Sequence, residues 1–137
     1  MLIQKRGLSQ FKWFPKAAST VFELGDAVAF NLTGGIVRAT SSSTNILGMI
    51  KRAVTASDTD YATTALVPVQ VFVPEDEIEI DASTTVTAAM IGTYRDLSNS
   101  STLNVGAVGG NLTFRVLGIG STTSKAVVSL VRNSLSS

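Results

Sequence analysis

The sequence predicts an all-β protein, a small β-barrel or sandwich of about eight short antiparallel strands with an extended N-terminal arm. Hydrophobic residues make up 45% of the 137 residues and charged residues 15%, so a domain of this length can bury a core. The apolar positions are rich in Val and Ile, whose branched side chains favour the pleated surface of strands. Ser, Thr and Gly separate the apolar runs as turn formers, and long segments with helical periodicity are missing.

Seven segments have the apolar pattern and the length that are typical of strands. They cover residues 27–32, 36–39, 46–54, 65–74, 75–83, 112–119 and 125–132. Gly34-Gly35 is expected to supply the positive φ angles of a tight hairpin turn between the first two. Gly48 indicates a bulge or a close backbone approach, and Pro68, which cannot donate to a ladder, indicates an edge strand or a bulge. Residues 84–96 fit either a strand pair or a short helical turn over 87–91.

One cluster of carboxylates is present in the sequence. It consists of Glu75, Asp76, Glu77, Glu79 and Asp81. Alternation with period two predicts that Glu77, Glu79 and Asp81 face solvent while Ile78 and Ile80 face the core. Acids on one strand face lie about 7 Å apart, which is too wide for three of them to share a calcium ion without a second loop. We expect a solvated strand face, and a contact with a basic partner or a calcium site are the alternatives.

The composition argues against catalysis. The chain has no His and no Cys, which removes the usual base for a Ser nucleophile and most metal-ligand sets. No Ser-x-x-Lys setting is present, and the glycine-rich stretches lack the Lys-Ser/Thr ending of a phosphate-binding loop. We therefore expect no enzyme, no cofactor and no metal. A net charge of +1 and the lack of an apolar run of about 20 residues predict neither a nucleic-acid nor a membrane partner.

Residues 1–19 are predicted to form the N-terminal arm, and residues 20–137 a single β-domain. The arm carries cations and aromatic side chains without any acid. Because Trp, Phe and Arg concentrate binding energy in interfaces, we expect the arm to bind a partner. The residues expected to do so are Lys5, Arg6, Phe11, Lys12, Trp13, Phe14 and Lys16. The alternative is an edge strand whose aromatic side chains close one end of the core.

Turn glycines and apolar strand positions form a pattern over residues 22–54, about a quarter of the chain. Its members are Phe22, Gly25-Asp26, Val28, Gly34-Gly35, Val37 and Ile46-Leu47-Gly48. The pattern resembles that of the capsid decoration, or cement, proteins of tailed bacteriophages. The resemblance implies a β-barrel-like domain that binds the major capsid protein on the outside of an assembled head, with the arm in contact. It also implies a homo-oligomer, with a trimer favoured, that is made in the host cytoplasm and resides on the virion.

Two other functions remain open from the sequence. Another virion component, such as a head-fibre base, a head-completion protein or a tail-tube protein, would share these features. A carbohydrate-binding β-module belongs to a different class. Such modules display aromatic platforms, for which Trp13, Tyr61 and Tyr94 provide few side chains.

Overall fold

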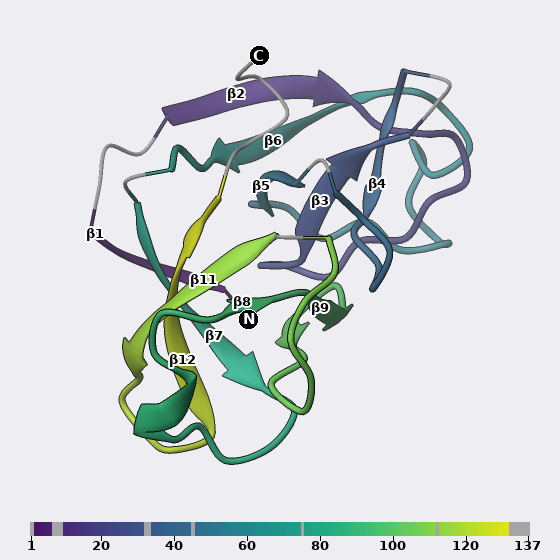
Figure 1. The fold of residues 1–137 in the computed structure, drawn as a ribbon. Helices are drawn as coiled ribbons and strands as arrows, with labels where there is room; N and C mark the ends of the chain where they lie inside the picture. The colour runs from purple at the N-terminus through teal and green to yellow at the C-terminus, as the bar shows by residue number, and fades with distance from the viewer. Residues whose placement is uncertain are drawn as a thin grey trace.

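A computed structural model describes residues 2–6, 10–31, 34–44, 46–74, 76–111 and 113–131, with the backbone alone for residues 4–6. The all-β prediction is confirmed, because the described residues form two sheets and one short 3₁₀ helix, η1 (Ala88–Met90) (Figure 1). The first sheet contains β1 (Ile3–Arg6), β7 (Glu77–Ala82), β8 (Tyr94–Arg95), β9 (Leu97–Asn99), β10 (Thr102–Leu103), β11 (Phe114–Ile119) and β12 (Lys125–Leu130). The second contains β2 (Gln10–Pro15), β3 (Ala27–Phe30), β4 (Ile36–Arg38), β5 (Ile46–Ile50) and β6 (Leu66–Val71).

The first sheet is nearly closed into a barrel. Its strand order is β8-β11-β12-β7-β10-β9, and β8 and β9 are separated in the chain only by Asp96, so the two ends of this order meet. β1 pairs with β7 in antiparallel fashion, and β10 pairs with the same strand in parallel. Large side chains such as Ile78, Ile80 and Phe114 fill the interior and are completely buried.

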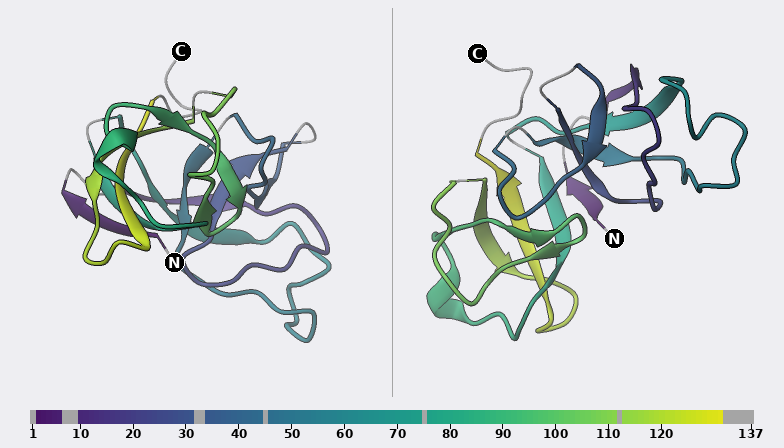
Figure 2. Two further views of the ribbon diagram at one scale, coloured as in Figure 1. Left: turned by 60° about the horizontal axis from the view of Figure 1, so that its bottom comes forward. Right: turned by 90° about the vertical axis from the view of Figure 1, so that its right-hand side faces the viewer.

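The second sheet has the order β2-β6-β5-β3-β4 and curves around a core of its own. Just beyond β2, the Ala17 N–H donates to the Ile36 carbonyl of β4 over 3.0 Å, which brings the two ends of the sheet together. Alternation along β3 directs Val28 into this second core and Ala27 into the core of the first barrel. The two sheets therefore pack side by side and share the wall made by β3 and β5, as both views in Figure 2 show.

Glycine positions fix two features that the sequence predicts. Gly34 has a φ of +94° in the β3–β4 turn, and these two strands pair as the expected hairpin. Gly48 allows the close approach of β5 to β6, since a Cβ atom there would lie 2.0 Å from the carbonyl oxygen of Gln70. The prediction for Pro68 is wrong, because β6 lies between β2 and β5 and its register shows no bulge. The backbone of Pro68 faces β5, and its carbonyl accepts from the Lys51 N–H over 3.0 Å. Proline has no N–H to donate in return, so the pairing of β6 with β5 lacks one hydrogen bond, but the rest of the register with β5 is kept.

The region 84–96 combines both interpretations. The 3₁₀ helix η1 forms the short helical turn, and β8 follows it as a two-residue strand beside β11. The strands expected over 112–119 and 125–132 are present as β11 and β12, and they pair in antiparallel fashion.

Candidate functional site

The segment predicted to be an arm is built into both sheets. β1 pairs with β7, and β2 pairs with β6 over its whole length. The edge-strand alternative describes the backbone of residues 10–15, since β2 ends the strand order of the second sheet, but of its three aromatic side chains only Phe14 packs against a core. An arm that leaves the domain is not what the described residues form, because β1 and β2 are each hydrogen-bonded to a neighbouring strand.

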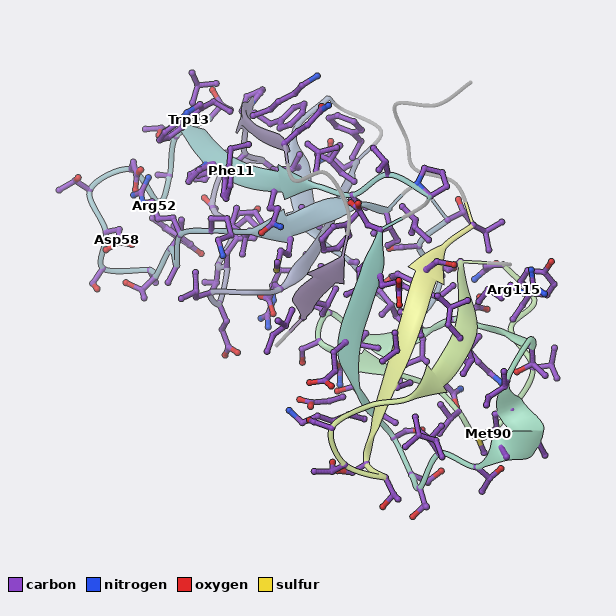
Figure 3. The ribbon with its side chains drawn as sticks, turned by 90° about the vertical axis from the view of Figure 1, so that its left-hand side faces the viewer. Phe11, Trp13, Arg52, Asp58, Met90 and Arg115 are labelled. Atoms are coloured by element: carbon purple, nitrogen blue, oxygen red, sulfur yellow. The ribbon has the colours of Figure 1, made fainter. Side chains whose placement is uncertain are left out.

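Aromatic side chains stand exposed on one face of β2. Phe11 is 60% exposed and Trp13 is 62% exposed (Figure 3). The register with β6 places Trp13 directly opposite Pro68, and Pro15 opposite Leu66, which is 56% exposed. We call Phe11, Trp13, Pro15, Leu66 and Pro68 together the aromatic face.

An exposed cation borders the aromatic face. The Lys51 N–H donates to the Pro68 carbonyl, so Lys51 lies opposite Pro68 and projects from the same side of the sheet. Lys12 is exposed on the other side of β2, between Phe11 and Trp13 in the sequence. The face therefore joins large apolar area to positive charge, a combination that suits a partner surface with apolar and acidic side chains.

Two of the seven residues expected to bind a partner face inward instead. Phe14 packs in the second core, with its ring 5.6 Å from that of Phe30 in an edge-to-face arrangement. Lys16 is completely buried, which corrects the expectation that it contacts a partner. Both follow the alternation of β2, which sends Phe14 and Lys16 to the side opposite Trp13. The side chains of Lys5 and Arg6 lie outside the described residues.

The buried ammonium of Lys16 holds the long loop over residues 51–65. Its Nζ atom donates to the carbonyl oxygens of Tyr61 and Thr63, each over 2.6 Å, and lies 6.0 Å from the centre of the Tyr61 ring. Arg52 and Asp60 add an ion pair of 2.6 Å across this loop, which projects from the second sheet (Figure 3). The hydrogen bond from Arg52 keeps the pKa of Asp60 below its ordinary value, against the opposing effect of desolvation.

The acidic strand is only partly the solvated face that alternation predicts. Ile78 and Ile80 are buried as expected, but Glu79 is also buried, with 4% of its surface exposed. The turn after β11 folds over β7, and Ser121 donates to Glu79 from its N–H over 2.8 Å and from its hydroxyl over 3.3 Å. The prediction is wrong for Glu79 because a turn far along the chain covers it.

The remaining acids also serve the fold. Asp76 is fully buried and accepts from the Val73 N–H over 3.1 Å, closing the turn before β7. Asp81 forms an ion pair with Lys125 at 3.5 Å, while Glu75 lies outside the described residues. Within the described ranges, no three His, Cys, Asp or Glu side chains lie close enough to hold a metal ion.

Sequence reasoning treated Gly25-Asp26 as a turn and missed that Asp26 joins the two sheets. The Asp26 carboxylate is 2% exposed and accepts from the Glu23 N–H over 2.8 Å and from the Ser100 hydroxyl over 3.0 Å. Arg38 of β4 brings its Nε atom to 2.7 Å from Oδ2, outside hydrogen-bond geometry, and its Nη2 donates to Oδ1 over 3.5 Å. The neighbouring Ala27 N–H donates to the Ser100 carbonyl over 2.7 Å. The sequence offers a single signal for this role of Asp26, a Gly-Asp turn directly before an apolar strand.

One hollow of about 410 Å³ lies between the two sheets. It is lined by Arg38, Ala39, Thr40, Ser41, Ser98, Asn99 and Ser100. Its one cationic side chain, Arg38, already pairs with Asp26, so the charge that could attract an anion is neutralised. The aromatic face is the stronger candidate for a functional surface.

Comparisons with known proteins do not assign a family. No protein-family model matches the sequence, and no curated protein is similar to it. Among the residues that the structure describes, no helix is long and apolar enough to cross a membrane.

Proposed function

We propose that the protein is a structural component of a bacteriophage virion, a decoration protein that binds the outside of the assembled head. The observation that carries the proposal is the aromatic face, in which Phe11 and Trp13 are exposed on a regular edge strand. The pattern over residues 22–54 supports it, because that pattern resembles decoration proteins and its residues include β3 and β5, the wall between the two cores. The partner is the major capsid protein, and the chain acts as a homo-oligomer, with a trimer favoured.

Covering the aromatic face supplies the energy for binding. Aromatic side chains bury about 150–250 Å² each, so covering the exposed parts of Phe11 and Trp13 removes about 250 Å² from water. At about 25 cal/mol per Å², this contributes about 6 kcal/mol before the entropy cost of association. A protein that binds the assembled shell and not the free subunit stabilises the shell by mass action, and the many copies on a lattice multiply the effect.

The proposal is tested by sedimenting assembled heads with the purified protein. Trp13→Ser is expected to lower the affinity for heads by at least about 30-fold, the loss of about 2 kcal/mol that marks a central interface residue, and Phe11→Ser to act in the same direction. Both variants should melt at the native temperature, because their side chains are exposed. Leu117→Ser, an exposed apolar residue on the first barrel, is the matched control and should bind as the native protein does.

Two results would contradict the proposal. The first is a native protein that does not sediment with heads, and the second is a Trp13→Ser variant that binds as tightly as the Leu117→Ser control. The number of copies per virion separates the alternatives within the same class. A decoration protein covers the shell, whereas a head-fibre base, head-completion or tail-tube protein occupies fewer sites.

A further inference from the structure

Within the described ranges, the hydrogen-bond pattern of β2 leaves one row of its backbone groups without a partner. In an antiparallel pair, successive residues point their N–H and C=O groups alternately toward and away from the partner strand. The Lys16 N–H donates to the Ala65 carbonyl over 3.0 Å, and this bond continues the β2–β6 register. Lys12 and Phe14 therefore direct their backbone groups to β6, while Phe11 and Trp13 direct theirs outward.

A second hydrogen bond confirms this alternation from the other side of β6. The Lys51 N–H donates to the Pro68 carbonyl, so Pro68 turns its backbone toward β5 and not toward Trp13 opposite. Among the described residues, no backbone group pairs with the outer edge of β2 before Lys16, which forms a parallel bridge with Ile36 through the Ala17 N–H. Phe11 and Trp13 thus present two N–H and two C=O groups in a row, directly beside the aromatic face.

We propose that an extended segment of the partner adds to β2 as a further strand, with its side chains alternating across the aromatic face. An unpaired edge strand is a template for such an addition, in which main-chain hydrogen bonds give affinity and side chains give specificity. The inference rests on the proposed function only for the identity of the partner, a capsid subunit.

Two of the registers in which a second copy of this chain could pair with the edge are unfavourable. If Phe11 pairs with Trp13 of the other copy, Lys12 lies directly opposite the other Lys12, and like charges in that position are destabilising. If Trp13 pairs with its own equivalent, Phe11 lies opposite Pro15, which has no N–H to donate. The positive charge of Lys12 favours instead a different chain, one that carries an acidic side chain opposite Lys12.

A change to one backbone atom tests the proposal without altering any side chain. Since the chain has no Cys, residues 1–17 can be synthesised and ligated through a cysteine at position 18, which is then desulfurised to Ala18. N-methylation at Trp13 replaces the outward N–H by a methyl group. We expect the protein methylated at Trp13 to melt at the same temperature as the unmethylated semisynthetic protein. Its affinity for heads should be at least tenfold lower. N-methylation at Phe14, whose N–H faces β6, is the control and should lower the melting temperature.

The charge preference is tested with Lys12→Glu, which is expected to weaken binding to heads at unchanged melting temperature because Lys12 is exposed. The proposal is overturned if N-methylation at Trp13 leaves the affinity unchanged while Trp13→Ser lowers it, since side chains alone would then bind and the proposed function would stand. It is also overturned if N-methylation at Trp13 destabilises the fold as it does at Phe14, or if native protein dimerises through β2. If the native protein does not sediment with heads, both proposals are overturned.

Discussion

Replacing Asp26 by Ala tests whether the junction between the two sheets depends on one buried carboxylate. The substitution removes the acceptor for the Glu23 N–H and the Ser100 hydroxyl, and it leaves the guanidinium of Arg38 without its ion-pair partner. Removing one member of a buried ion pair costs about 3–5 kcal/mol. The Arg38 side chain is 37% exposed and regains some hydration, so we expect the lower part of that range, about 3 kcal/mol.

The measurement is urea and thermal unfolding of the native protein and the Asp26→Ala variant. For a chain of this length, a loss of about 3 kcal/mol corresponds to a melting temperature lower by about 10 °C. Asp26→Asn keeps an acceptor of the same shape without the charge, so its loss should be smaller. A double-mutant cycle with Arg38→Ala isolates the pair and should give a coupling energy of about 1–3 kcal/mol. A loss below about 1 kcal/mol for Asp26→Ala would refute this reasoning.

Two other predictions follow from single contacts. Gly48→Ala should lower the free energy of unfolding by about 3 kcal/mol or prevent folding, because its Cβ atom would lie 2.0 Å from the Gln70 carbonyl oxygen of a paired strand. Gly110→Ala is the control, since the space around it is open, and should change the free energy of unfolding by less than about 0.5 kcal/mol. Equal urea midpoints for the two variants would contradict this. Because the Arg52 hydrogen bond lowers the pKa of Asp60 in the folded protein, its contribution to stability is complete above the ordinary value of 3.8 and is lost as the pH falls through the lower folded value. An NMR titration should place the pKa of the Asp60 carboxyl below 3.8, and Arg52→Ala should raise it; an unchanged midpoint would rule out Arg52 as the cause.

The candidate site could be predicted in part from the sequence. The aromatic and basic composition of residues 1–19 predicts a partner-binding segment, and alternation along a strand separates Trp13 from Phe14 once β2 is known to be a strand. The sequence could not show that Lys16 is buried, because its ammonium donates hydrogen bonds to the carbonyl groups of Tyr61 and Thr63, which lie 45 and 47 residues away in the chain. The burial of Glu79 has the same origin, since Ser121 is 42 residues distant.

Local patterns alone determined that the chain is all-β, where the Gly34 hairpin turns, and that Ile78 and Ile80 face a core. These features depend on residues within a few positions of one another, through the period of a strand and the conformational freedom of glycine. Only the tertiary structure decided that two sheets share one wall, that Asp26 joins them, and that no other described strand pairs with the outer edge of β2. Strand order and the burial of a polar group depend on contacts between segments that are distant in the chain. Such contacts are set by the energy of the whole fold and leave no local pattern in the sequence.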